Sequence, residues 1–288
     1  MIETPFDDPK PVDETVFDKV EINLTPKLET VVSWALKKSV PFEDGLFVVE
    51  RSIYGEPFKE VTNPIDDCMV VINDPVVASP DIEAVSWRVA YHVAGNVYTS
   101  IPLKGHLKVS KSDKGLLNVI AHREAMTFDR YSGTTGLLLK ARTSGRPCPV
   151  CTDWGIETSA RSSCPNCYGT GHAGGFYNGK PWKLCILGAP DTSKSTTPTL
   201  GSIEAGNKVI ARALFENPAE AGDIWINKDT QERWQISGVK PEIVFKGLVI
   251  TIKLEMTRLQ LSEAHPINNP ETSEKLQQPS TGGLWETL

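Results

Sequence analysis

Four of the six cysteines lie within twenty residues of one another, in the spacing of a metal site. They form two Cys-x-x-Cys pairs, Cys148 with Cys151 and Cys164 with Cys167, separated by twelve residues. A Cys-x-x-Cys turn directs two sulfurs to one point, and two such turns supply the tetrahedral set of thiolates that Zn²⁺ prefers. The twelve residues between the pairs suffice for the chain to fold back on itself. We therefore expect all four cysteines to bind one structural zinc ion, with no open position for water.

The residues around the pairs support this interpretation. Gly169 and Gly171 follow the second pair, and glycines there would allow backbone N–H groups to turn toward sulfur. His172 is near enough to compete as a ligand, but four cysteines complete the set, so we interpret it as a surface-loop histidine. Cys68 and Cys185 stand in apolar segments and are expected to be small buried residues. The alternative to a metal site is four reduced thiols, which would be open to oxidation.

The sequence contains no recognisable catalytic constellation. The motifs GxxxxGK[ST], HExxH and GxSxG are absent. His122-Arg123-Glu124 falls on an expected helix, where a solvated polar face explains it better than an acid–base pair. Asp66-Asp67 reads as a turn, and a calcium role is the weaker alternative. We therefore expect a protein without enzymatic activity.

Composition narrows the class of protein. The 288 residues include 30 Lys and Arg against 36 Asp and Glu, a net charge of −6, which argues against broad adhesion to nucleic acid or anionic lipid. A hydrophobic content of 40% with seven Trp is enough for folded cores. No apolar run approaches the roughly 20 residues of a membrane helix. The N-terminal residues lack the apolar region of a secretory signal. These features predict a soluble, intracellular, multidomain protein.

Short alternating strands precede the cysteines. Between residues 25 and 105 such strands are separated by turn residues, and Val85–Val93 is followed by an Ala-Gly-Asn turn and a returning strand. This pattern predicts a β-sandwich. The segments VVSW, GLFVVERSIYGEPFKEV and SWRVAYHVAGNVYTS resemble a fibronectin type III or related immunoglobulin-like domain. The resemblance implies an adhesive or spacer module and carries no catalytic residue.

A helix and a second β-rich region surround the cysteines. Residues 112–131 have a helical period, with Ser112 as the expected cap. Leu137–Leu139 reads as a short buried strand. Strands return from Lys208 to Leu261 as a small antiparallel meander, a barrel or half-barrel.

The predicted fold class is therefore mainly β. It combines an N-terminal immunoglobulin-like β-sandwich, one central helix, a four-cysteine zinc knuckle and a small C-terminal β-barrel or meander. The expected segments are an extended arm (1–24), the sandwich (25–105), the helix and a connecting strand (106–145), the zinc segment (146–180), the barrel-like domain (181–261) and a flexible tail (262–288).

The middle and the end of the chain together resemble a family of phage proteins. The segments HREAMTFDRYSGTTGLLLKARTSGRPCPVC, SCPNCYGTGHAGGFY and EAGDIWINKDTQERWQISGVKPEIVFKGLVITIKLEMTRL are similar to neck or head–tail joining proteins of contractile-tailed bacteriophages. The matching positions are Arg123, Glu124, Leu137 to Leu139, the four cysteines, Gly169, Gly171, Gly174, Gly175, Phe176, Gly222 to Ile224, Arg233 to Ile236 and Val239. The chain departs from the family pattern at His172 and Ala173, where an aliphatic pair is usual, and the sandwich is an addition.

The resemblance implies a structural virion protein in the neck, assembled in the host cytoplasm. Its partners would be other neck, portal and tail proteins and further copies of the chain in a ring, with genomic DNA only passing through and no membrane. A baseplate or other tail protein is the alternative within this class. A zinc-ribbon protein that binds nucleic acid is the alternative from another class.

The second cysteine pair and the glycines after it also resemble part of another family. The CxxCxGxG unit is similar to the repeats of DnaJ-type chaperones, which have four such units and a His-Pro-Asp tripeptide. This chain has one unit, and Ile267 follows His265-Pro266. We therefore do not expect a chaperone of that type.

Overall fold

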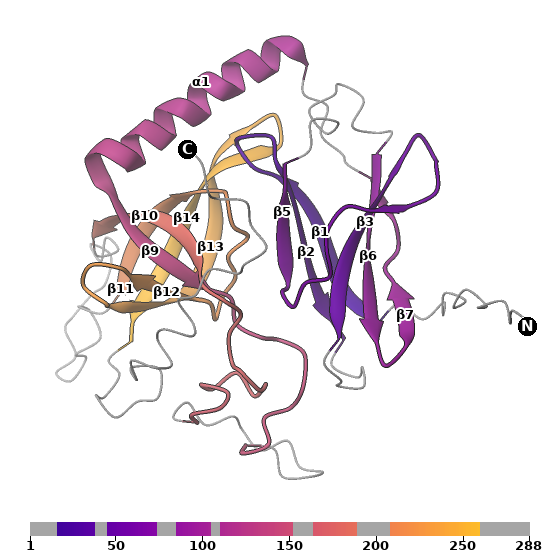
Figure 1. Cartoon of the computed structure of the whole chain (residues 1–288). Helices are drawn as coiled ribbons and strands as arrows, with labels where there is room; N and C mark the ends of the chain where they lie inside the picture. Colours follow the sequence, from indigo (N-terminus) through magenta and orange to yellow (C-terminus); the bar gives the residue numbers. More distant parts are fainter. Residues whose placement is uncertain are drawn as a thin grey trace, which may run out of the picture.

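The computed structural model confirms the mainly β fold. Its described part contains two antiparallel sheets, an α-helix of 17 residues, a cluster of four cysteines and a closed barrel of six strands (Figure 1). The barrel and the two sheets lie side by side. The structure describes residues 16–37, 45–73, 85–104, 110–151, 164–188 and 208–259.

The N-terminal sheets follow the strand order of an immunoglobulin-like sandwich. Strands one, two and five form one sheet, whereas strands three, six and seven lie in the other with two short strands at its edges. The first sheet consists of β1 (Phe17–Leu24), β2 (Thr30–Leu36) and β5 (Met69–Ile72). The second consists of β4 (Lys59–Glu60), β3 (Leu46–Ile53), β6 (Val85–Val93), β7 (Asn96–Thr99) and β8 (Leu103–Lys104).

One apolar core lies between these sheets. Phe47 of β3 stacks on Tyr91 of β6, with ring centroids 4.7 Å apart, and packs against Trp34 of β2 at 5.2 Å. Phe17 of β1 reaches the same ring at 6.5 Å. Aromatic contacts of this kind add to the stabilisation from area burial alone. The two sheets therefore form a sandwich with a shared interior.

The predicted arm over residues 1–24 is wrong for its second part. Residues 17–24 form β1, which pairs with β2 from Phe17↔Leu36 to Leu24↔Thr30. Phe17 and Leu24 are buried, so this segment contributes to the core despite its charged residues. The first fifteen residues of the predicted arm, and the predicted tail over 262–288, lie outside the described residues.

The barrel closes through six antiparallel pairings. Each strand pairs with its neighbour in the order β10-β11-β14-β13-β12-β9, and β9 returns to β10. Closure leaves no unpaired strand edge. The strands are β9 (Gly133–Leu139), β10 (Lys180–Gly188), β11 (Lys208–Leu214), β12 (Ile224–Asn227), β13 (Arg233–Phe245) and β14 (Leu248–Arg258).

Buried tryptophans fill the barrel. Trp182 and Trp225 are at most 2% exposed, and the indole of Trp225 donates to the carbonyl of Trp182 at 3.3 Å. The indole of Trp182 donates to the Leu214 carbonyl at 3.1 Å. A Cβ added at Gly136 of β9 would lie 2.3 Å from the Trp225 ring, so the glycine provides space for this side chain. The indole donors of these two tryptophans are therefore satisfied, whereas the buried indole N–H of Trp234 in the same core has no hydrogen-bond partner.

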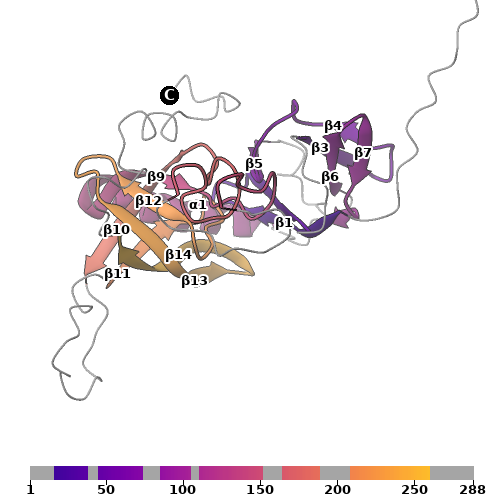
Figure 2. The same cartoon turned by 90° about the horizontal axis from the view of Figure 1, so that it is seen from below.

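The predicted boundary of the barrel, 181–261, requires correction. We expected Leu137–Leu139 to be a short connecting strand in the segment 106–145, but the strand there, β9, begins at Gly133, pairs with both β10 and β12 and completes the barrel. The cysteine segment is consequently an insertion between two neighbouring barrel strands. It projects from one end of the barrel, and α1 lies across the opposite end (Figures 1 and 2).

The helix α1 (Lys111–Thr127) begins one residue after its cap. The cap is Ser110 rather than the expected Ser112, and the Ser110 hydroxyl accepts from the Asp113 amide at 3.2 Å. A single π-turn, η2 (Phe128–Ser132), joins the helix to β9. Leu117 is fully buried, whereas its neighbour Leu116 is 51% exposed, because adjacent helical positions face different directions.

The sandwich and the barrel share contacts of two kinds. The turn between β13 and β14 places Phe245 and Leu248 against the sandwich core, together with Leu117 of α1. Ion pairs join the rest of the interface. These are Lys19–Glu220 at 3.0 Å, Lys27–Glu216 at 3.3 Å, Arg142–Asp66 at 3.1 Å and Lys180–Asp67 at 2.9 Å. No helix in the described ranges has the length and apolar character needed to cross a membrane.

Candidate metal centre

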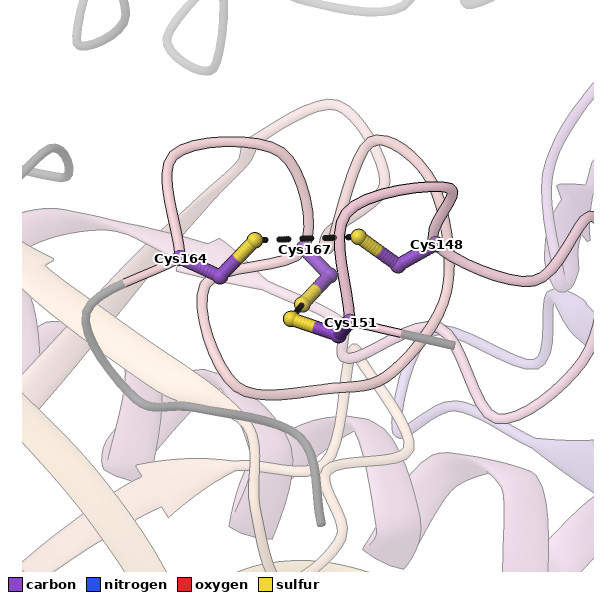
Figure 3. Close-up of side chains that lie close together, drawn as sticks. All are labelled: Cys148, Cys151, Cys164 and Cys167. Atoms are coloured by element: carbon purple, nitrogen blue, oxygen red, sulfur yellow. Dashed lines mark hydrogen bonds between the residues drawn. The ribbon is translucent and has the colours of Figure 1, made fainter. Parts of the chain in front are cut away.

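The four predicted cysteines converge at the outer end of the insertion (Figure 3). The sulfurs of Cys148 and Cys164 are 3.6 Å apart, and those of Cys151 and Cys167 are 3.7 Å apart. All four sulfurs lie within 4.8 Å of one another, and all four residues are buried. Among the described residues, no other group of three or more His, Cys, Asp and Glu side chains converges in this way.

These distances fit a tetrahedral metal ion and exclude disulfides. Zinc–sulfur bonds of about 2.3 Å in a tetrahedron place sulfurs about 3.8 Å apart, close to the observed separations. A disulfide requires an S–S distance of about 2.05 Å, and all six cysteines of the chain are free. The cluster could therefore hold a metal ion such as zinc.

Backbone amides point at the sulfurs of the second pair. The amides of Asn166 and Cys167 donate to the Cys164 sulfur, and those of Gly169 and Gly171 donate to the Cys167 sulfur. The two glycine donors confirm the expectation that glycine after the cysteines turns N–H groups toward sulfur. Such bonds stabilise thiolates, the ionisation state that a metal requires.

The amides and burial act in opposite directions on the thiol pKa values. At Cys164 burial raises the pKa, but the amides of Asn166 and Cys167 outweigh it and bring the pKa to about 6. At Cys167 burial dominates over the amides of Gly169 and Gly171 and raises the pKa to about 12. Thiols crowded this closely cannot all ionise without a cation, which is the electrostatic situation that a bound divalent ion resolves.

Left-handed backbone shapes the loop after Cys167. Tyr168, Gly169 and Gly171 have φ values of 49°, 92° and 82°, a region that favours glycine. Gly175 has φ 66°, and a Cβ there would lie 2.5 Å from the Tyr168 ring and 2.8 Å from the Cys167 carbonyl oxygen. The glycines matched by the family resemblance therefore have a steric reason in this fold.

A two-armed stem carries the cluster on the barrel. Beyond β9 and β10 the two arms continue to pair through isolated bridges, Ala141 with Phe176 and Pro147 with His172. Rungs of backbone hydrogen bonds run from the barrel to the cysteines. They are Tyr177 N to Lys140 O at 2.9 Å, Arg142 N to Gly175 O at 2.9 Å, Ala173 N to Arg146 O at 2.8 Å and Cys148 N to Gly171 O at 2.8 Å.

The other predicted residues are not part of the converging group of four. His172 is half-buried and takes part in the stem through its backbone, since its carbonyl accepts from Gly175 at 3.0 Å. Cys185 is buried in β10, as expected. Cys68 directly precedes β5 and is only half-buried, in contrast to the burial expected from the sequence. Burial nevertheless raises the pKa of the Cys68 thiol to about 12.

Two acidic residues have roles that the sequence did not reveal. Asp66 and Asp67 were expected in a turn of the sandwich, and the structure pairs them with Arg142 of the stem and Lys180 of β10. Of the segment His122-Arg123-Glu124, only the Glu124 carboxylate reaches the barrel, where it contacts Arg212 of β11 at 3.4 Å.

Sequence reasoning also missed a buried ion pair and a polar neighbour of the cluster. Lys140 Nζ lies 3.1 Å from the Asp223 carboxylate and donates to the Pro218 carbonyl at 2.8 Å. The side-chain amide of Asn166 lies 3.6 Å from the Cys148 sulfur. A charged residue directly after a buried strand, as Lys140 follows Leu139, is the only sequence signal for the pair.

Comparisons with protein-family models, with curated proteins and with solved structures found no match for this chain.

Proposed function

We propose that the four cysteines hold one structural Zn²⁺ ion and that the chain is a non-enzymatic structural protein of a tailed-phage virion, located in the neck between portal and tail. The metal assignment is supported by four buried sulfurs at tetrahedral separations. With four protein ligands no position is left for a reactive water, so the ion would stabilise the fold. The alternative of four metal-free thiols leaves the convergence of the sulfurs without a cause.

One observation carries the virion assignment. The block that resembles neck proteins, residues 118–260, forms a continuous structural unit in its described part, made of α1, the barrel and the inserted stem. β9 lies before the cysteines and its barrel partners β10 and β12 lie after them. Two of the three segments that resemble the family thus contribute strands to one barrel, and the third carries the second cysteine pair in the stem.

The physical character of the chain is compatible with a neck ring. A ring that encloses DNA without reading its sequence needs no basic groove, and a net charge of −6 would limit adhesion to the passing DNA. Closed rings form from head-to-tail interfaces between identical subunits. The partners in this proposal are further copies of the chain and the portal, neck and tail proteins.

Electron microscopy of lysates from a phage that lacks this gene tests the location. We expect DNA-filled heads beside complete but unattached tails. Joined particles with defective tail tips would instead indicate a baseplate protein. Normal particles would refute a required structural role in joining head and tail. Steep salt-dependent DNA binding by the purified chain would instead favour a zinc-ribbon nucleic-acid-binding protein.

A further inference from the structure

The stem that carries the cysteine cluster contacts the sandwich directly. Arg142 lies near the barrel end of the stem, where its backbone amide donates to the Gly175 carbonyl. Its guanidinium faces Asp66 of the sandwich through two N–O contacts of 3.1 and 3.5 Å. The same guanidinium lies over the ring of Tyr177, with its carbon 4.2 Å from the ring centroid. Arg142 is therefore held by both arms of the stem and by a residue 76 positions earlier in the chain.

Hydrogen bonds of the outer part of the stem, near the cysteines, help to position Arg142. Its backbone amide donates to Gly175, and Gly175 in turn donates to the carbonyl of His172. Gly174 donates to the carbonyl of Asn166, inside the second cysteine pair. Backbone hydrogen bonds, together with the covalent link from Gly174 to Gly175, thus connect the second cysteine pair to the backbone of Arg142.

The remaining contacts of the interface come from a different part of the molecule. Lys180, which pairs with Asp67, is the first residue of β10 and is held in the barrel by pairing with Leu138 of β9. Lys19 contacts Glu220, in the loop before β12. Barrel pairing holds these contacts, whereas Arg142 lies in the stem, between the barrel-side hydrogen bond from Ala141 N to the Asp223 carboxylate at 2.9 Å and the cysteine cluster.

We propose that Arg142 couples the metal centre to the sandwich, so that metal bound by the four cysteines restrains the Asp66 segment of the sandwich through the stem. Without metal the four sulfurs lose the ion that holds them together, the stem opens from its outer end, and the rung at Gly175 is lost before the barrel pairings. The Asp66 segment then loses one of its two ionic contacts with the rest of the molecule. The metal thereby restrains a segment of the sandwich to which none of its ligands belongs.

Hydrogen exchange tests this coupling, with the full chain compared in zinc-loaded and chelator-treated forms after the metal content of each is measured. We expect removal of zinc to speed exchange in the stem and, by roughly two- to fivefold, at the Ile65 and Cys68 amides, the change that a weak ionic contact produces. Ile65 donates to Phe47 and Cys68 to Asp67, so both amides report on the segment that holds Asp66. The outer strand β7 should not change.

Two matched variants distinguish coupling from general loosening. In Asp66→Asn the two amides should exchange faster with zinc present, and removal of zinc should add no further change. In Asp67→Asn, which alters the neighbouring pair with the barrel, the response of the Ile65 amide to zinc should remain; the Cys68 amide is excluded from this comparison because Asp67 is its acceptor. The Asp66 side chain is 59% exposed, so this variant should fold.

Coupling is refuted if zinc removal opens the stem of the wild type but leaves Ile65 and Cys68 unchanged, or if Asp66→Asn responds as the wild type does. The inference rests on the zinc assignment proposed above and is independent of the virion role. A loaded sample without metal would refute the zinc assignment itself, and the measured metal content separates the two failures.

Discussion

Lys246 Nζ lies 2.8 Å from both carboxylate oxygens of Asp113, which joins the turn between β13 and β14 to the first turn of α1. Asp113 also accepts from the Ser110 hydroxyl at 2.6 Å, so one carboxylate serves the helix cap and the hairpin together. The adjacent Leu248 and the helical Leu117 both enter the sandwich core. The pair therefore lies where helix, barrel hairpin and sandwich meet.

This pair predicts a specific pH dependence. Hydrogen bonds from Lys246 and Ser110 lower the pKa of Asp113 below its usual 3.8. A carboxylate with a lowered folded-state pKa stabilises the fold above its unfolded-state pKa, and this contribution is lost as the pH falls through the folded-state value. Asp113→Asn should therefore lower the melting temperature at pH 7, and the difference from wild type should shrink in acid below about pH 4.

Thermal unfolding followed by circular dichroism at pH 7 and in acid measures that difference. Glu255→Gln is the exposed comparison. The hydrogen bond from Lys240 also lowers the pKa of Glu255, but this contact is confined to the exposed surface of β13 and β14, so the loss should have the same pH dependence and be smaller. A difference between Asp113→Asn and wild type that is constant with pH would contradict the assignment.

The metal assignment predicts the zinc content of the chain and a local unfolding of the stem when a ligand is removed. Metal analysis of the reduced chain should give about one zinc per chain. Cys164→Ser should abolish stoichiometric binding and open the stem, while the barrel remains folded on its own tryptophan core. Cys185→Ser, at a buried cysteine outside the cluster, should retain the zinc. Zinc in Cys164→Ser at wild-type stoichiometry would show that the cluster is not the site.

Two adjacent glycines of the stem should differ in their tolerance of a side chain. Gly174 and Gly175 both have positive φ, 83° and 66°, so alanine at either position should cost about 1–2 kcal/mol of unfolding free energy from backbone strain. At Gly175 alanine also collides with Tyr168 and the Cys167 carbonyl, which should add about 1–3 kcal/mol. At Gly174 the nearest atom is the Arg142 Nε at 3.6 Å.

Urea denaturation together with the zinc affinity of each variant measures this contrast. Only Gly175→Ala should weaken zinc binding, because only there does the clash involve a ligand residue. Equal losses at the two positions would indicate that φ strain alone determines the effect.

Loss of the buried Lys140–Asp223 ion pair should lower the free energy of unfolding more than loss of the exposed Lys19–Glu220 pair. Burial works to lower the pKa of Lys140, but Asp223 outweighs it and raises the pKa, so the lysine stays charged. Lys140→Ala leaves the Asp223 carboxylate buried without its cation and should cost about 3–5 kcal/mol of unfolding free energy. Lys19→Ala, which removes another partner of Glu220 at a half-exposed site, should cost less than about 1 kcal/mol.

Urea denaturation of the two variants decides this point. A loss at Lys140 no larger than that at Lys19 would mean that water or a backbone shift compensates the buried carboxylate.

The extent to which the sequence predicts this fold depends on how local each signal is. The cysteine cluster is predictable because spacing alone brings the ligands together. Val85–Val93 alternates over most of its length and was predicted with its observed bounds. β1 was missed because its charged residues obscure the alternation, and it is stabilised by pairing with β2. The barrel role of β9 was missed because its partners begin more than forty residues later.

The interface was the least predictable part. Nothing local to Asp66 or Arg142 indicates that the two residues meet, because their contact follows from how the barrel and sandwich pack. The same holds for Asp113 and Lys246, which are 133 positions apart. Only the assembled chain reveals such long-range ion pairs.

The insertion of the cysteines between β9 and β10 has a consequence for the order of folding. The stem and its ligands need only residues 140–177, whereas closure of the barrel needs the chain through β14, which ends at Arg258. Contacts that close short loops form earlier than long-range strand pairings. We expect zinc binding to bring β9 and β10 together as a hairpin before the later strands form, and those strands then to assemble on this hairpin. During synthesis on the ribosome, zinc would thus select the register of the barrel before its last strand exists, and pulsed hydrogen exchange during refolding should show stem amides protected before those of β14.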